Sequence, residues 1–250
     1  MKSIVFYLKL FVVLGVLHVG ALLFGLCIFP LIPGSTRQVR QRRRRLIAGA
    51  VIAFYLRLLS ILKLLKITVL KRDLLPKMST ILVANHPTLF DALILLTLIP
   101  DSICIAKGAL RRHPAFALPI FWLGYITAQR GKSLIEIGGA ALAAGSSLII
   151  FPEGTRSTHF TSIDPFQRGA ASCALRCAAT ITPVVLSATS RVLGRKAGIF
   201  SISPGCYEVA VTIKPSIAAP PRPALELLPG AARDLTSELE LLFKTWLSKR

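Results

Sequence analysis

Two short segments of the sequence carry side chains that could do chemistry. Asn85 to Asp91 places the imidazole of His86 five residues before a carboxylate, and Phe151 to Arg156 ends on a guanidinium near a glycine. A histidine oriented by a carboxylate can act as a general base. A guanidinium suits a phosphate group, because its planar N–H fork matches the phosphate oxygens. Together the segments predict base chemistry on a substrate that bears a phosphate.

Each segment begins where an apolar, strand-like run ends. Ser79–Ala84 precedes the first and Ser147–Phe151 leads into the second, and a helix is expected from Ala92 to Leu98. Asp91 would then lie next to His86, bond one ring nitrogen and leave the other for a substrate proton. A histidine that only caps this helix is the alternative, because a His and an Asp at this spacing also occur by chance.

The two segments, in this order, resemble the signature of the glycerolipid acyltransferase family, which includes lysophosphatidate acyltransferases. The family residues that match His86 and Asp91 are the catalytic pair. The resemblance also implies that the second segment belongs to the acceptor site and that its arginine clamps the acceptor phosphate. The predicted substrate-binding residues of this segment are Glu153, Gly154, Thr155 and Arg156.

Two further segments extend the resemblance, which covers about residues 81 to 213. Gly124 to Arg130 looks like the family's Gly-x-x-x-x-x-Arg block, so Arg130 is expected to be a second phosphate ligand. The segment around Pro183 resembles the last family block, a strand that helps to shape the acyl pocket. Gly124 and Lys107 complete the predicted substrate-binding set. The chain departs from many members after His86, where it has Pro87 and Thr88 instead of a polar residue and serine.

The resemblance implies a membrane-bound acyltransferase that moves a fatty acyl group from a thioester of coenzyme A or acyl carrier protein to a lysophospholipid hydroxyl. The expected acceptor is 1-acyl-sn-glycerol-3-phosphate, with ornithine lipids, polyene-type lipids and glycerol 3-phosphate as alternatives. A thioester hydrolase and a non-catalytic protein that binds anionic lipid are the rival classes. We expect no cofactor, no metal and no nucleic-acid partner, since the five cysteines show no metal-ligand spacing and read as small buried side chains.

The first 36 residues form the expected membrane segment. Residues 4 to 32 are almost wholly apolar, which exceeds the roughly 20 residues that cross a bilayer and argues against a cleaved signal peptide. Six arginines follow between Arg37 and Arg45, within a net charge of +20. Such a run attracts anionic headgroups and holds its flank in the cytoplasm, so we expect the catalytic domain on the cytoplasmic side of the plasma or inner membrane. A nucleic-acid arm is the alternative use of these arginines.

The rest of the chain is expected to form an α/β domain with a mixed, largely buried sheet flanked by helices. Residues 37–72 would hold the basic run and an apolar helix from Leu46 to Leu70, either interfacial or a second membrane crossing. Alternating strands and helices place the acyltransferase domain at 73–215. Residues 216–250 read as a proline-rich linker and an amphipathic helix, whose apolar stripe is Leu235, Leu239, Leu242, Phe243 and Trp246.

Overall fold

A computed structural model describes residues 2–127, 132–158, 162–189, 204–218, 221, 224 and 226–248. Its centre is a seven-stranded sheet with the order β1-β7-β6-β2-β5-β3-β4. Strands β2 to β6 run parallel to one another, β7 is antiparallel to β6, and β1 is parallel to β7. The strands are β1 Leu65–Leu70, β2 Ile81–Ala84, β3 Ser102–Ala106, β4 Ile126–Thr127, β5 Ser147–Ile150, β6 Ile181–Ala188 and β7 Tyr207–Ile213. The mixed α/β fold is therefore confirmed.

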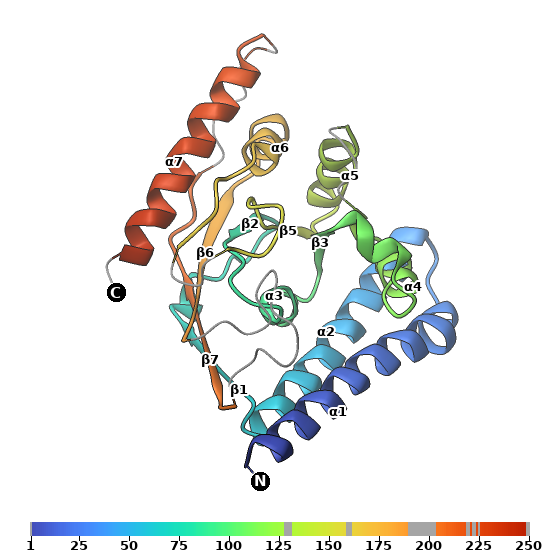
Figure 1. Ribbon diagram of the computed structural model, residues 1–250. Coiled ribbons are helices and arrows are strands. Elements are labelled where there is room, and N and C mark those ends of the chain that lie inside the picture. Colours follow the sequence, from blue (N-terminus) through green and yellow to red (C-terminus); the bar gives the residue numbers. More distant parts are fainter. Residues whose placement is uncertain are drawn as a thin grey trace.

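Helices cover both faces of the sheet because its central strands are apolar on both sides. Alternate residues of β2 show this: Leu82 packs in one core cluster and Ile81 in the other. The first cluster lies under α1 (Lys2–Leu23), α2 (Arg37–Ile61) and α3 (Asp91–Leu98), and the second under α5 (Lys132–Ala143), α6 (Gly169–Cys177) and α7 (Leu228–Ser248). Figure 1 shows the sheet between these two layers, with α4 (Ala117–Leu123) beside α2. The expected amphipathic C-terminal helix is α7.

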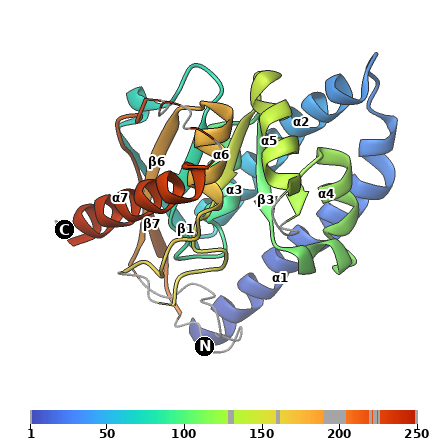
Figure 2. The same ribbon diagram turned by 90° about the horizontal axis from the view of Figure 1, so that it is seen from above.

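The N-terminal part is a helical hairpin. After α1 the helix continues through one π-helical segment, Phe24–Ile28, and one 3₁₀ turn, Phe29–Leu31, before the chain reverses into α2. The reversal lies at the side of the molecule in Figures 1 and 2. The hydroxyl of Tyr55 in α2 donates to the carbonyl of Val13 in α1 at 3.2 Å, which ties the two helices together.

Two expectations about the local structure were wrong. The apolar helix from Leu46 to Leu70 ends at Ile61, and its last six residues form β1, so the sheet begins ahead of residue 73. Lys63 adopts φ 57° at the break, and the polar and apolar residues then alternate as in a half-buried strand. From the sequence we also expected a strand from Trp122 to Arg130. Instead Trp122 and Leu123 end α4, and in the described part of this segment, which stops at Thr127, Ile126–Thr127 form β4.

We expected the arginine run to form a lipid-facing patch, but two of its side chains are buried. Arg44 and Arg45 are buried, with 4% and 3% of their surface exposed. The Nε atom of Arg44 donates to the carbonyl of Phe29 at 2.7 Å, and its guanidinium lies 4.6 Å from the ring centroid of Trp122. Arg45 forms an ion pair with Asp101 at 2.7 Å. Both side chains therefore hold the fold together. Arg37, Arg42 and Arg43 are exposed and Arg40 is half-buried, although Arg42 also pairs with Asp101 at 3.2 Å.

The cysteines also differ from expectation. Cys104 and Cys173 are buried, and Cys177 is half-buried. Cys27 and Cys206 are exposed, although we expected all five to pack as small apolar side chains. The difference follows from position, because Cys27 lies on the apolar N-terminal segment and Cys206 precedes β7.

Candidate active site

The two chemical segments meet because their strands are neighbours. Strands β2 and β5 are parallel and adjacent, with Val83 opposite Ile150. The residues that follow each strand must therefore leave the sheet at the same carboxyl edge, which is where ligands bind in open α/β sheets. His86 follows β2 at this edge and Glu153 follows β5.

His86 and Asp91 form the predicted pair. The Nδ1 atom of the imidazole lies 2.8 Å from Oδ2 of the carboxylate. Asp91 is fully buried as the first residue of α3, whereas 18% of the His86 side chain is exposed. Since an ionised carboxylate only accepts hydrogen bonds, Nδ1–H donates to Asp91 and the other ring nitrogen, Nε2, can take a proton from a substrate.

Two neighbours of this pair were not predicted from the sequence. The ring of Phe151 stacks against the imidazole, with ring centroids 4.2 Å apart and planes at 23°. The backbone N–H and the hydroxyl of Thr88 both donate to the Asp91 carboxylate, at 2.6 and 2.5 Å. Thr88, a departure from the family pattern, thus gives Asp91 the hydroxyl partner that a serine could also provide. The only sequence signal for either residue was its place inside a motif.

The peptide of His86 is held by the second segment. Its N–H donates to Oε1 of Glu153 at 2.9 Å, and its carbonyl accepts from the N–H of Ser157 at 2.8 Å. On the other side of β2, the side-chain amide of Asn85 donates to the carbonyl of Leu186 in β6 and accepts from its N–H, both at 2.8 Å. The His86 peptide is therefore held by the segment that follows β5, and the residue before it is held by β6.

The predicted substrate-binding residues of the second segment lie in different surroundings. Glu153 is buried, with 4% of its surface exposed, and burial raises the pKa of its carboxyl group. Gly154 has φ +68°, and a Cβ there would lie 2.5 Å from Nε2 of Gln167, so a larger residue would be strained. Thr155 and Arg156 are half-buried on the same turn.

The guanidinium of Arg156 lies close enough to the His86–Asp91 pair to interact with the charge of Asp91. Burial lowers the pKa of its guanidinium, and the negative charge of Asp91 acts in the opposite direction. The residue that follows it, Ser157, bonds directly to the His86 carbonyl. The structure therefore brings the predicted base and the predicted phosphate ligand together.

The remaining predicted residues divide between the two edges of the sheet. Lys107 follows β3 at the carboxyl edge and is exposed. Gly124 precedes β4, which runs parallel to β3, so it lies at the opposite edge; with φ +71° it ends α4, and a Cβ would meet the side chain of Gln41 at 2.7 Å. Gly124 thus has a structural role at the end of α4, and its expected contact with substrate stays a prediction. Arg130 lies outside the described residues.

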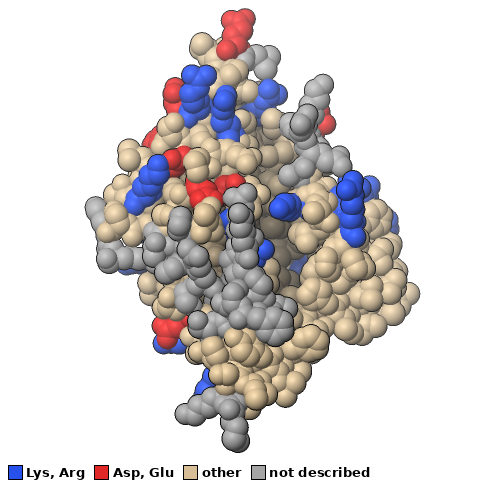
Figure 3. Space-filling model, viewed as in Figure 1, with Lys and Arg blue, Asp and Glu red and all other residues tan. Residues whose placement is uncertain are grey.

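Basic side chains gather around the carboxyl edge. The face of the molecule in Figure 3 is hollowed near its centre, over the place where α3 and β3 lie in Figure 1, and Lys and Arg side chains border this hollow. Positive charge beside a concave surface favours an acidic ligand. Within the described part of the chain, no group of three or more His, Cys, Asp or Glu residues could hold a metal ion.

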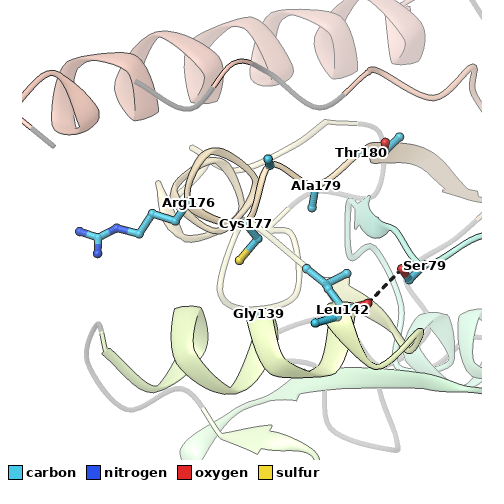
Figure 4. Close-up of a pocket in the computed structure, with 9 residues that line it drawn as sticks. Ser79, Gly139, Leu142, Arg176, Cys177, Ala179 and Thr180 are labelled. Atoms are coloured by element: carbon cyan, nitrogen blue, oxygen red, sulfur yellow. Dashed lines mark hydrogen bonds between the residues drawn. The ribbon is translucent and has the colours of Figure 1, made fainter. Parts of the chain in front are cut away.

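A separate cavity of about 430 Å³ opens at the other edge of the sheet. It is lined by residues that precede β2 and β6, among them Ser79 and Thr180, and by the C-terminal ends of α5 and α6 (Figure 4). Ser79 donates to the carbonyl of Leu142 there, at 3.1 Å. Because β2 separates this cavity from His86, the two do not form one site.

Comparisons with known proteins agree with the geometry. The acyltransferase family model matches residues 66–187, a range that holds both chemical segments. A 1-acyl-sn-glycerol-3-phosphate acyltransferase alpha of Mus musculus is 30% identical over 143 residues, which are 54% of this chain and 50% of the relative. The 1-acyl-sn-glycerol-3-phosphate acyltransferase of Saccharomyces cerevisiae is 30% identical over 166 residues, 60% of this chain and 52% of the relative. The chain thus spans about half the length of these curated relatives.

A solved structure shares the whole fold. The crystal structure of the 1-acyl-sn-glycerophosphate acyltransferase PlsC from Thermotoga maritima superposes with a TM-score of 0.71, covering 100% of this chain and 97% of that one. The sequences are 20% identical, so this likeness concerns the fold, including the N-terminal apolar helix.

Proposed function

Since the chain belongs to the PlsC-like glycerolipid acyltransferase family, we propose that it transfers a fatty acyl group from an acyl thioester to the hydroxyl of 1-acyl-sn-glycerol-3-phosphate. The observation that carries this proposal is the 2.8 Å contact between His86 and Asp91, with the Arg156 turn bonded to the His86 peptide. A base and a phosphate ligand at one sheet edge suit an acceptor that carries both a hydroxyl and a phosphate. Coenzyme A or acyl carrier protein would supply the acyl group.

The reaction follows from the free ring nitrogen. Nε2 of His86 takes the proton of the acceptor hydroxyl. At the same time the hydroxyl oxygen attacks the thioester carbonyl, which forms a tetrahedral intermediate. The C–S bond then breaks, the ester remains on the acceptor, and the imidazolium returns the proton to the departing thiolate. Asp91 stabilises the positive charge on the ring throughout, as the carboxylate does in a Ser-His-Asp triad.

The first test is product identification. Purified chain is supplied with isotope-labelled acyl thioester and a panel of acceptors, and mass spectrometry identifies the acylated lipid. We expect labelled phosphatidate from 1-acyl-sn-glycerol-3-phosphate, and a loss of about 10² to 10⁴ in rate for His86→Ala, which removes the base. Labelled free fatty acid as the main product would indicate a hydrolase, and an unchanged rate in the variant would contradict the role of His86.

The second test concerns the acceptor phosphate. Arg156→Ala should raise the acceptor KM much more than the thioester KM, and Arg156→Lys should restore little, because an ammonium lacks the bidentate fork. Arg176→Ala, an exposed arginine at the other edge of the sheet, serves as the control. Equal effects on both substrates would argue against a phosphate ligand and favour an acceptor without phosphate.

The same proposal includes a membrane location. Among the described residues one helix, Ser3–Leu31, is long and apolar enough to cross a bilayer, and 17% of its most apolar window is buried. Both ends of this helix contact the catalytic domain: Phe6 contacts Tyr207 of β7, and the Trp122 indole N–H donates to the Gly25 carbonyl at 3.0 Å. A helix held against the domain at both ends favours an anchor that lies in one leaflet over a crossing. We place the domain on the cytoplasmic side, where acyl thioesters occur.

Sidedness can be tested with a native thiol. Cys206 is exposed on the catalytic domain, whereas burial raises the pKa of Cys104 to about 12, which suppresses its reactive thiolate. In a chain with Cys27→Ser and Cys177→Ser, an impermeant maleimide should label Cys206 in inside-out vesicles and leave it unlabelled in intact cells. Cys206→Ser identifies background labelling. Labelling from outside intact cells would contradict the cytoplasmic location.

A further inference from the structure

We infer that Glu153 is a positioning residue that joins the base to the turn bearing Arg156, and not a substrate ligand as its motif suggests. This inference depends on the proposed function. Its carboxylate is turned into the protein and accepts three hydrogen bonds, each at 2.9 Å. The donors are the N–H of His86, the hydroxyl of Ser157 and the N–H of Asp164.

These bonds close a ring around the base. The His86 N–H and the Ser157 hydroxyl share Oε1 of Glu153, while the Ser157 N–H donates to the His86 carbonyl at 2.8 Å. Both polar groups of the His86 peptide are thus held by Glu153 and Ser157. A shift of this carboxylate would move the imidazole relative to the substrate hydroxyl.

The second carboxylate oxygen of Glu153 binds the backbone near the end of the loop that follows Arg156. Oε2 accepts from the N–H of Asp164, and the Asp164 carboxylate in turn accepts from the N–H and hydroxyl of Thr158 at 3.1 and 2.7 Å. Arg156 lies between two residues, Glu153 and Ser157, that are bonded to each other. One buried carboxylate therefore sets the geometry of both the base and the phosphate ligand.

A ligand and a positioning residue predict different kinetics. If Glu153 bound the acceptor, its loss would raise the acceptor KM. If it holds His86 in place, its loss misaligns the base in the transition state and lowers kcat, because displacements of about 1 Å can reduce a rate by about 10²-fold. Glu153→Gln keeps an oxygen for the His86 and Ser157 donors but brings an NH₂ group against the Asp164 N–H, so it should retain more activity than Glu153→Ala.

The experiment measures kcat and both KM values for Glu153→Ala, Glu153→Gln and Ser157→Ala, with the exposed Glu136→Gln as the matched control. We expect kcat to fall by about 10²-fold in Glu153→Ala, by less in Glu153→Gln and by roughly tenfold in Ser157→Ala, with little change in the acceptor KM. Ser157→Ala keeps the Glu153 side chain and its bond to His86. It therefore still tests the positioning role if Glu153→Ala fails to fold.

Two results would overturn the inference. One is an acceptor KM that rises in Glu153→Gln while kcat is kept, which would make Glu153 a ligand. The other is a kcat equal to that of wild type in both single variants, Ser157→Ala and Glu153→Gln. The proposed function is tested separately, because His86→Ala must lose activity whichever role Glu153 has. If wild-type chain transfers no acyl group to any acceptor, the proposed function fails first and independently.

Discussion

At the scale of single residues, the His86–Asp91 pair depends on neighbours that hold its carboxylate. Asp91 is fully buried, and an ionised carboxylate without partners would be costly in such a place. Thr88 offsets this cost with its N–H and its hydroxyl, and His86 adds Nδ1–H. These donors also fix the carboxylate orientation, so the imidazole is aimed by Thr88 through Asp91.

Thr88 is therefore expected to affect the rate without binding substrate. Thr88→Val removes the hydroxyl at nearly constant volume, and we expect kcat to fall roughly tenfold, which corresponds to about 1.4 kcal/mol of barrier. Thr88→Ser keeps the hydroxyl and should stay near the wild-type rate. Steady-state kinetics with saturating thioester checks both variants. A wild-type rate in Thr88→Val together with a loss in Thr88→Ser would show that the methyl group, and not the hydroxyl, matters.

Glu153 gives a pH dependence of stability at the same scale. Burial raises the pKa of its carboxyl group, so the folded chain keeps this proton at pH values where the unfolded chain has lost it. The stability from this group is therefore complete below the ordinary carboxyl pKa and is lost as pH rises through the raised value. Glu153→Gln does not titrate, so its Tm should improve relative to wild type as pH rises across this window. Tm profiles in detergent that run parallel would contradict this expectation.

At the scale of elements, the arginines of α2 close the end of the first helical segment. The carbonyls that end a helix have no partner within it and carry partial negative charge. Arg44 donates to one such carbonyl, that of Phe29, at 2.7 Å, and Arg43 and Arg40 donate to the carbonyls of Pro33 and Gly34 in the loop that follows, both at 2.9 Å. The basic run thus stabilises the reversal between α1 and α2, whatever its remaining side chains do at a membrane.

Arg45 connects α2 to the sheet. Besides its ion pair with Asp101, it donates to the Leu123 carbonyl at 3.2 Å and to the Ser146 hydroxyl at 3.0 Å. We expect Arg45→Gln to lower the free energy of unfolding by about 2 kcal/mol, because Asp101 loses its buried partner and keeps only the exposed Arg42, whose Nε lies 3.2 Å away.

The matched control for that substitution is Arg37→Gln, at the exposed start of α2, which should change stability by less than about 0.5 kcal/mol. Denaturant unfolding in detergent measures both. If the two substitutions had equal effects, the buried network would contribute no more to stability than a surface charge.

At the scale of the whole molecule, one side is apolar and the site lies elsewhere. The side chains of Ile4, Leu8 and Phe11 on α1 are between 62% and 72% exposed, and Leu31 in the turn that follows is 79% exposed. The lower right of Figure 3, where α1 and α2 lie, is nearly free of charge. Exposed apolar patches of this kind mark a membrane or protein interface. The hairpin would immerse this side while the hollow stays in reach of the membrane surface.

This arrangement predicts which substitutions release the chain from membranes. Leu8→Glu with Phe11→Glu should weaken binding to phospholipid vesicles, since each buried side chain contributes about 1.5 to 3 kcal/mol. Leu241→Glu is the control, because Leu241 is equally exposed, at 66%, but lies on α7. Vesicle flotation measures the bound fraction. Equal release by the double variant and the control would contradict the assignment of this face.

The sequence alone was enough to predict the two chemical segments and the strands that precede them. Strand-like apolar runs predicted β2, β5 and β6 and placed His86 and Arg156 after strand ends, because hydrophobic periodicity and turn residues are local properties of the chain. The motif spacing identified His86 and Asp91 as a pair. The stripe of apolar residues near the C-terminus predicted α7.

Tertiary structure decided what depends on partners distant in the chain. The arginine run looks like a lipid-binding patch in the sequence, but Asp101 and Ser146 lie 56 and 101 residues from Arg45. Gly124 looks like part of the site, but the parallel direction of β4 puts it at the other edge. The sequence predicts Glu153 as a ligand, and only the fold shows that its carboxylate accepts hydrogen bonds from His86, Ser157 and Asp164. Burial and hydrogen bonding across such separations are set by strand order, which no local pattern encodes.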